Sequence, residues 1–407
     1  MHIEQHRLAN NIRIVHKRTS GAVAHCGIII NCGSRDEGED EQGLAHYIEH
    51  VIFKGTKKRK AYHILSRMED VGGEINAFTT KEETCVYSSF MPEYYERSLE
   101  LLQDIVFEST FPSKELVKEK TVVIDEINSY KDNPSEQIFD DFEELLFQDH
   151  SIGRNILGTP KHVKSFNKKM ISDFISRNYL TDEMVISSVG NIEFKKLVQM
   201  IEKLFGHIPK SDKTKTRSPF KNYQPFHKKV SHSGFQTHAK LGSIAQEATS
   251  NKKTAMILLN NILGGPGMNS RLNLSIREKY GLTYSIESHY TPYSDTGIFS
   301  IYLASDKDST QRCISLVKKE LELFCKKPLG PQQLKKGKLQ LIGQIAIGQE
   351  SEVNLMLSIA KSILLYNRID SFEEVKNKIN NVSPEIVQEV ANEVFNPSNL
   401  SSLIYST

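Results

Sequence analysis

The sequence predicts two similar domains, each built from short strands and amphipathic helices. Its 407 residues are too many for one ordinary core and enough for two domains of roughly 200 residues each. Segments rich in β-branched residues alternate with longer segments of helical periodicity, and this order of elements starts again after a polar stretch. We therefore expect a first domain over residues 1–208, a linker over 209–226 and a second domain over 227–407.

The first half contains elements whose ends have recognisable signals. Strands are predicted at 12–15, 26–32, 75–80 and 85–91, and helices at 43–55, 61–71, 93–108 and 113–130. The glycine pair after Val71 ends the second helix, and Asn133-Pro134 follows the fourth. After the polar stretch, a strand at 238–245 and helices at 251–263 and 332–349 repeat the pattern, which indicates an internal repeat.

The composition excludes several classes of protein. The 52 basic and 50 acidic residues nearly balance, so no electrostatic footprint for nucleic acid exists. The apolar runs are far shorter than the roughly 20 residues that cross a bilayer, and the N-terminus resembles neither a signal peptide nor a transit peptide. The five cysteines form no Cys-x-x-Cys pair, which argues against disulfides and a cysteine zinc site. We expect a cytoplasmic protein without a nucleic-acid or membrane partner.

The segment His46-Tyr47-Ile48-Glu49-His50 carries the strongest chemical pattern. Residues four apart on a helix face the same way, so His46 and His50 can present imidazoles to one metal ion. Glu49 lies close to that face and can take a proton from a metal-bound water, whose pKa zinc lowers from about 16 toward about 7. The order His-x-x-Glu-His is that of the inverted zincins. Taken alone, the pentapeptide is equally consistent with a solvated helix face.

Two carboxylates in the predicted helix over 113–130 are candidates for completing a metal site. Glu119 and Glu126 are seven residues apart, about two turns, and flank an apolar stripe that includes Val123. Burying an unpaired carboxylate is costly, so such residues normally have a cation or a metal as partner. The alternative is a helix edge at which both glutamates reach water.

At these residues the sequence resembles the zinc peptidase family of pitrilysin, mitochondrial processing peptidase and insulin-degrading enzyme. In that family a glutamate ligand follows His-x-x-Glu-His after roughly 75 residues, and here 75 residues separate His50 from Glu126. The resemblance implies that His46, His50 and Glu126 bind one zinc ion per chain, that Glu49 is the general base, and that Glu119 orients the site without binding the metal.

Two further segments resemble the family along the chain. The stretch from Gly72 to Thr79 is similar to the family's edge strand, so Asn76, Ala77 and Phe78 are implied to bind an extended substrate as an added strand. Without the resemblance, Asn76 and Ala77 would indicate only the start of a strand.

In the second half, Arg277 and Tyr284 resemble the family's Arg and Tyr pair, which contacts substrate near the scissile bond. Without the family, both would be taken as surface residues. The basic tract from Lys54 to Lys60 is interpreted as a solvated helix end and loop.

The resemblance implies an α+β fold with two homologous domains, each a largely antiparallel sheet with helices packed against it. A shift of 211 residues aligns the three key positions of the pentapeptide with Ile257, Asn260 and Asn261, so the second domain is expected to lack the metal. The implied activity is hydrolysis of unfolded or presequence-like peptides by a zinc endopeptidase. A homodimer is the first expectation and a heterodimer with a zinc-less homologue the variant. The rival hypothesis is a structural or assembly subunit that keeps this fold without catalysis.

Overall fold

The computed structural model of the chain describes residues 3–232 and 234–406, which form two compact units. The first unit comprises Met1–Asn128, Arg154–Ser218 and Ile347–Ile369. The second comprises Ser129–Gly153, Pro219–Ala346 and Asp370–Thr407. The chain thus passes between the units inside the linker predicted over 209–226, and it also exchanges two helical segments between the sequence halves.

The first unit is built on a six-stranded sheet with the order β1-β2-β6-β3-β5-β4. The strands are β1 (Glu4–Arg7), β2 (Arg13–Arg18), β3 (Ala24–Ile30), β4 (Glu74–Thr79), β5 (Thr84–Phe90) and β6 (Met184–Gly190). All neighbouring strands pair antiparallel except β2 and β6, which are parallel. The strand β4 lies at one edge of this sheet.

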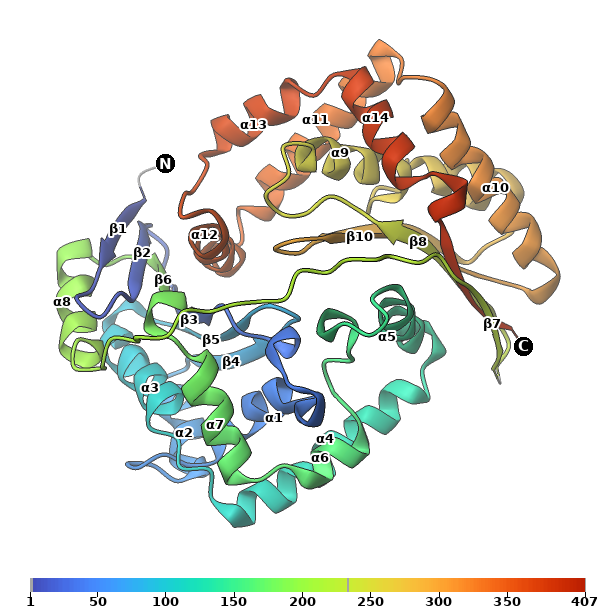
Figure 1. Ribbon diagram of the computed structural model, residues 1–407. Helices are drawn as coiled ribbons and strands as arrows, with labels where there is room; N and C mark the ends of the chain where they lie inside the picture. The colour runs from blue at the N-terminus through green and yellow to red at the C-terminus, as the bar shows by residue number, and fades with distance from the viewer. Residues whose placement is uncertain (1–2, 233, 407) are drawn as a thin grey trace. The chain divides into compact units, whose positions relative to one another are not determined.

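Most helices of the first half cover one face of this sheet (Figure 1). They are α1 (Leu44–Val51), α2 (Ala61–Glu69), α3 (Tyr95–Phe107), α4 (Ser113–Lys131), α6 (Pro160–Ser165), α7 (Lys168–Asn178) and α8 (Phe194–Phe205). Successive side chains of a strand point to opposite faces, so Cys26, Ile28 and Ile30 of β3 join these helices in the main core. The intervening Ile29 points to the other face.

A helix from the second half of the chain covers that other face. Helix α12 (Glu352–Tyr366) packs Met356, Ile359 and Ile363 against Ile29 and Val185 of the sheet. The Ser187 hydroxyl of β6 also donates a hydrogen bond to the carbonyl of Met356 at 2.7 Å. The first unit therefore completes its core with a segment that lies far away in sequence.

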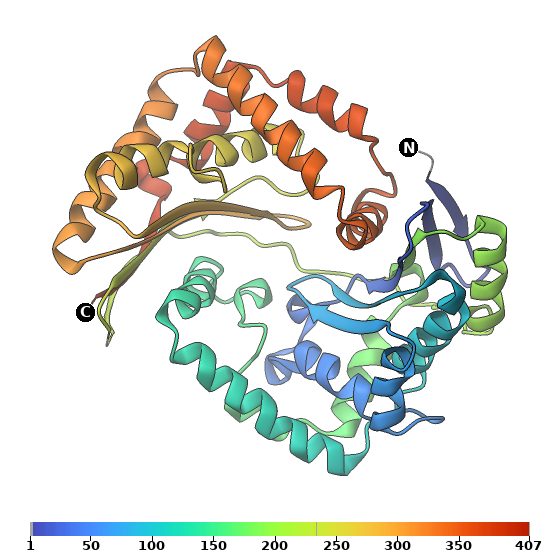
Figure 2. The same ribbon diagram turned by 180° about the vertical axis from the view of Figure 1, so that it is seen from behind.

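The second unit repeats this design in a five-stranded sheet with the order β7-β11-β8-β10-β9. Its strands are β7 (His227–Ser231), β8 (Thr237–Ile244), β9 (Ser285–Pro292), β10 (Gly297–Ser305) and β11 (Ser401–Ser406). One face packs against α9 (Lys253–Gly264), α10 (Lys307–Lys326), α11 (Pro331–Gly348), α13 (Phe372–Asn380) and α14 (Pro384–Val394). The other face is covered by α5 (Pro134–Leu146), a helix of the first half (Figure 2).

The two sheets confirm the internal repeat. Taken in chain order, β2 to β6 and β7 to β11 occupy the same places in their sheets, and each set has one parallel pair. The helices α5 and α12 cover the second face of the sheet that belongs to the other half. Within the ranges that the structure describes, no helix is both long and apolar enough to cross a membrane.

The helix predicted over 113–130 is α4, whereas the helix predicted over 43–55 is shorter than expected. Helix α1 ends at Val51 and passes into a 3₁₀ turn over Ile52–Lys54. The next residue, Gly55, has a φ of 154°, a conformation that an ordinary side chain disfavours and that cannot continue a helix.

Replacing Ile359 with Ala tests whether α12 completes the first unit. We expect the free energy of unfolding to fall by about 2–5 kcal/mol, because the substitution leaves a cavity under a fully covered sheet face. Urea denaturation followed by circular dichroism measures the change, since the chain contains no Trp. The exposed neighbour Ser358 provides the control variant Ser358→Ala. Equal stability of the two variants would contradict this role of α12.

Candidate metal centre

Helix α1 presents its histidines from a largely buried position. Its apolar residues, among them Leu44, Ile48 and Val51, pack into the main core of the first unit. This packing turns the opposite side of the helix, which carries His46 and His50, toward α4. The two rings meet edge to face with centroids 4.7 Å apart, and His46 as a whole is only 8% exposed.

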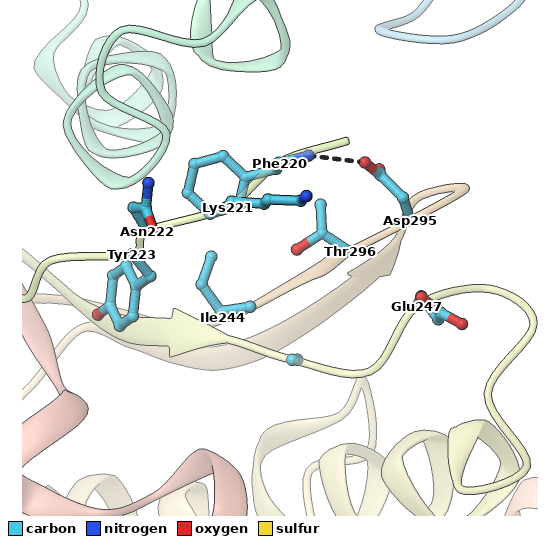
Figure 3. A pocket seen from close by; sticks show the side chains of 9 residues that line it. Phe220, Lys221, Asn222, Tyr223, Ile244, Glu247, Asp295 and Thr296 are labelled. Carbon is cyan, nitrogen blue, oxygen red and sulfur yellow. Dashed lines mark hydrogen bonds between the residues drawn. The ribbon is translucent and has the colours of Figure 1, made fainter. Parts of the chain in front are cut away.

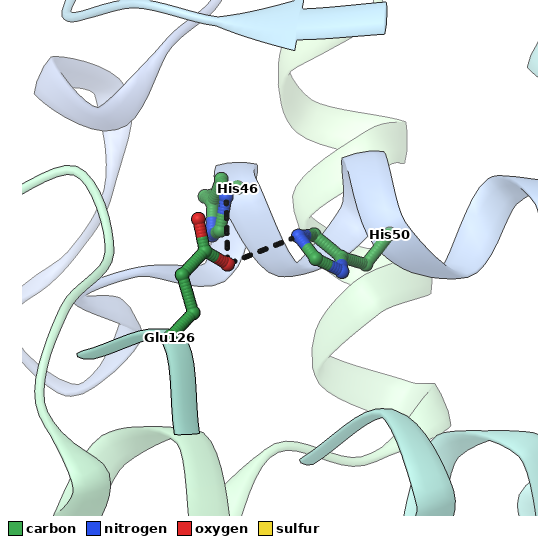
Figure 4. Close-up of side chains that lie close together, drawn as sticks. All are labelled: His46, His50 and Glu126. Carbon is green, nitrogen blue, oxygen red and sulfur yellow. Dashed lines mark ion pairs between the residues drawn. The ribbon is translucent and has the colours of Figure 1, made fainter. Parts of the chain in front are cut away.

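The carboxylate of Glu126 on α4 lies against both rings (Figure 4). Its Oε2 atom is 3.8 Å from Nε2 of His46 and 3.4 Å from Nε2 of His50. One ligand atom from each residue can be chosen so that all three lie within 4.8 Å of one another. Over residues 3–232 and 234–406, these three side chains form the one His, Cys, Asp or Glu group with such an arrangement.

The charge state of the site favours metal binding over an ion pair. Burial lowers the pKa of His46 to about 3, and the neighbouring His50 acts in the same direction. The imidazole of His46 is therefore neutral at pH 7, with a lone pair available to a metal. A neutral ring forms no salt bridge with Glu126, so the carboxylate has no countercharge from His46.

The donor set fits a zinc ion. Two imidazole nitrogens and one carboxylate oxygen match the His₂Glu sites of zinc hydrolases. Ligand atoms about 2.1 Å from a tetrahedral metal are separated by about 3.4 Å. The distances of 3.4 Å and 3.8 Å from Glu126 to the two rings are close to that spacing. Small side-chain rotations would bring the three atoms around one ion.

Glu49 also lies on α1, and its carboxyl is partly buried and not fully hydrogen-bonded. Burial raises the pKa of Glu49, and the charge of Glu126 also raises it, whereas Thr79 and His50 oppose the shift. Its Oε2 atom is buried and has no hydrogen-bond partner among the described residues. A carboxylate with a buried, unused acceptor atom is equipped to bind a water molecule or a proton.

Two contacts join α1 and its following turn to α4. The hydroxyl of Tyr47 donates a hydrogen bond to the carbonyl of Leu116 at 2.7 Å. Burial raises the pKa of Tyr47 and the charge of Glu119 acts in the same direction, so the phenol remains a donor. Glu119 itself pairs with Lys54 at 2.7 Å, across the start of the next turn.

These two contacts include residues that the sequence analysis did not assign to the site. Tyr47 lies inside the pentapeptide, and its partner is a backbone carbonyl that no side-chain pattern reveals. Lys54 belongs to the tract that we interpreted as solvated, but its amine is engaged by the buried carboxylate of Glu119. The pairing of Glu119 with a lysine also shows where its charge is compensated.

The remaining predicted site residues lie on other elements. Asn76, Ala77 and Phe78 belong to the edge strand β4 of the first unit. Arg277 lies in a π-helical turn over Asn273–Glu278 of the second unit. Tyr284, also of the second unit, is 57% exposed, and its hydroxyl contacts Asp306 Oδ1 at 3.2 Å.

The second unit contains a cavity of 290 Å³ beside the end of β8 (Figure 3). It is lined by Phe220, Lys221, Asn222, Tyr223, Ile244, Ala245, Glu247, Asp295 and Thr296. The amide of Phe220 donates a hydrogen bond to Asp295 at 2.8 Å across its rim. None of the predicted site residues lines this cavity.

Replacing Tyr47 with Phe tests the contact between α1 and α4. We expect the free energy of unfolding to fall by about 0.5–1.5 kcal/mol, because one buried hydrogen bond is lost without a change in packing. Urea titration monitored by circular dichroism measures the loss. Tyr62→Phe is the matched control, since the Tyr62 side chain is 73% exposed. A loss of stability in Tyr62→Phe as large as in Tyr47→Phe would refute the assignment.

Comparison with known proteins places the chain among peptidases. The family described as insulinase (peptidase family M16) matches residues 13–160, and the peptidase M16 inactive domain matches residues 165–341. A Bacillus subtilis protein, the uncharacterized zinc protease YmxG, is 33% identical over 406 residues, covering 99% of this chain and 98% of that protein. An uncharacterized zinc protease of Rickettsia bellii is 31% identical and covers 93% of this chain and 91% of its own length.

Solved structures share the fold at lower identity. A protein of Pseudomonas fluorescens described as a peptidase M16 inactive domain has a TM-score of 0.93 at 18% identity, covering 100% of this chain and 98% of that chain. A protease of Helicobacter pylori has a TM-score of 0.91 at 20% identity and covers 100% and 99%. The α+β fold with two homologous domains is thereby confirmed. The chain belongs to peptidase family M16, in its two-domain form, and is a metallopeptidase.

Proposed function

We propose that the chain is a zinc endopeptidase that hydrolyses unfolded or presequence-like peptides and holds one zinc ion with His46, His50 and Glu126. The observation that carries the proposal is the convergence of three donor atoms within 4.8 Å, one of them from a buried histidine that is neutral at pH 7. The names of the relatives, which are described as zinc proteases, support the choice of metal.

Glu49 is the general base of the proposed reaction. When bound, zinc supplies an acidified water, with a pKa lowered from about 16 toward about 7. The carboxylate of Glu49 accepts the proton of the attacking water and then delivers it to the nitrogen of the leaving amine. Burial raises the pKa of Glu49, which makes its carboxylate a stronger proton acceptor.

The edge strand β4 is the proposed binding surface for the substrate backbone. An extended peptide adds to a sheet edge through main-chain hydrogen bonds, which demand little of its sequence. Asn76, Ala77 and Phe78 are the residues of β4 that we assign to this contact. A folded protein offers few extended segments with free backbone groups, so the substrates are unfolded peptides.

The second unit supplies the remaining substrate contacts in this proposal. The phenol of Tyr284 donates a hydrogen bond to the oxyanion that develops at the scissile carbonyl, and the guanidinium of Arg277 binds substrate carbonyls or a carboxylate. The exposure of Tyr284 supports this assignment, because among the described residues its hydroxyl pairs with an exposed carboxylate, that of Asp306.

Two substitutions separate metal binding from proton transfer. Glu126→Gln should weaken zinc binding, whereas Glu49→Gln should keep zinc and reduce kcat by about 10²–10⁴-fold, because only the proton transfer is removed. Zinc analysis after dialysis and a peptide digest with and without chelator measure both effects. Asp125→Asn, at an exposed position next to Glu126, is the control. Normal turnover by Glu49→Gln would exclude it as the base, and a wild-type chain without zinc or activity would favour a structural subunit.

We also propose that the working form is a homodimer. This chain has two domains, whereas longer members of the family that it resembles join four domains in one chain. All three proposed zinc ligands lie in this chain, which argues against dependence on a partner that brings the metal site. Light scattering at micromolar concentration should give twice the mass of one chain. The mass of a single chain at that concentration would exclude a stable dimer.

A further inference from the structure

The N-cap position of helix α1 has no side chain of its own to cap the helix. Its N-cap residue is Gly43, which has a φ of 92° and therefore a left-handed backbone conformation. A Cβ atom at Gly43 would lie 2.5 Å from the carbonyl oxygen of Leu157, so no larger residue fits. The first amides of a helix have no partner within the helix, and leaving them buried and unpaired is costly.

Glu37 supplies the missing cap from six residues upstream. Its Oε2 atom accepts a hydrogen bond from the amide of Gly43 at 2.9 Å, and its Oε1 atom accepts one from the amide of Ala45 at 2.8 Å. Both oxygens of one carboxylate thus bind the first turn of α1. A negative charge at this position also interacts favourably with the helix dipole.

The carboxylate of Glu37 is buried, which is unfavourable for a charged group. Glu37 is 5% exposed, and burial raises its pKa well above the usual range, against the opposing hydrogen bonds from Ala45 and Gly43 and the charge of Arg154. Burying a carboxylate is unfavourable unless its hydrogen bonds and neighbouring charges compensate. Here the compensating groups are the start of the helix and one arginine.

The backbone around Glu37 is held from two sides. The guanidinium of Arg154 donates hydrogen bonds to the carbonyls of Glu37 at 2.8 Å and Gly38 at 3.1 Å. The preceding residue, Asp36, accepts hydrogen bonds from Arg217 at 2.8 Å and from Lys215 at 2.9 Å, in a nearly buried cluster. The position of the Glu37 carboxylate is therefore fixed by the loop as well as by the helix.

We propose that Glu37 is a positioning residue for the metal centre. Its two hydrogen bonds fix the first turn of α1 along the helix axis and against rotation about that axis. His46 is thereby held where it can share an ion with His50 and Glu126. The inference rests on the proposed zinc site. His46 directly follows Ala45, whose amide Glu37 binds, so a shift of the first turn displaces the His46 ring. The bonds that Glu37 makes within the described residues are to backbone amides of α1, so it acts through the backbone of this helix.

Glu37→Gln tests the proposal while preserving the size of the side chain. An amide has one acceptor oxygen and one NH₂ donor, so Gln can satisfy only one of the two helix amides and opposes the other with a donor. We expect the zinc Kd to rise about 10–100-fold, as for other residues that orient metal ligands. At saturating zinc, the KM for a peptide should stay within about twofold of the wild type, because ground-state substrate binding is unchanged.

Glu39→Gln is the matched control. It removes the same charge from the same loop, at an exposed position, and should leave the zinc Kd unchanged. Hydrogen exchange gives a readout that does not depend on activity. The amides of Gly43 and Ala45 should exchange faster in Glu37→Gln than in Glu39→Gln, because their acceptors are lost or weakened.

The outcomes separate the proposal from the zinc assignment on which it rests. If wild-type protein binds no zinc, the proposed function fails. If the wild type binds zinc and a folded Glu37→Gln variant has the same zinc Kd, the positioning role is overturned. Should Glu37→Gln not fold, Arg154→Ala decides, because it keeps the carboxylate and frees its backbone. A zinc Kd raised several-fold in Arg154→Ala supports the role, and an unchanged Kd overturns it.

Discussion

The contact between α1 and α4 sets the geometry of the metal centre, because His46 and His50 come from one helix and Glu126 from the other. A shift of either helix by one residue would move a ligand by about 1.5 Å, which is more than a zinc coordination sphere tolerates. The hydrogen bond from Tyr47 to Leu116 and the pairing of Lys54 with Glu119 act at two points along this contact. The apolar face of α1 holds the helix on the sheet, so the histidines have little freedom to retreat.

The electrostatics of the site follow from the same packing. Burial keeps His46 neutral and raises the pKa of Glu49, and both effects prepare the groups for the roles proposed here, metal ligand and proton acceptor. The charges of two buried glutamates near α1 are compensated by partners on other elements. Lys54 compensates the charge of Glu119, and the helix amides and Arg154 compensate that of Glu37. Glu119 and Glu37 therefore carry charges that are compensated by structural contacts, whereas one oxygen of Glu49 has no such partner among the described residues.

The sequence indicated the three side chains that we propose as zinc ligands, but not the contacts that position them. Helical periodicity placed His46 and His50 on one face, and the family resemblance implied Glu126 as a partner, whose carboxylate lies 3.4 Å from His50. Glu37 could not be found in this way, because its partners are backbone amides and its distance from α1 follows no helical period. The sequence also could not show that α5 and α12 each pack on the sheet of the other half of the chain. An apolar helix face indicates that the helix covers a sheet, but not which sheet it covers.

The central claim is that His46, His50 and Glu126 jointly bind one zinc ion. Anomalous diffraction at the zinc absorption edge, from crystals of the full chain grown with zinc, tests it most directly. The account predicts one strong peak per chain, about 2.0–2.2 Å from a nitrogen of each histidine and from a carboxylate oxygen of Glu126. A crystal in which the zinc peak lies away from these three side chains, or in which no ordered zinc appears beside them, would contradict the account.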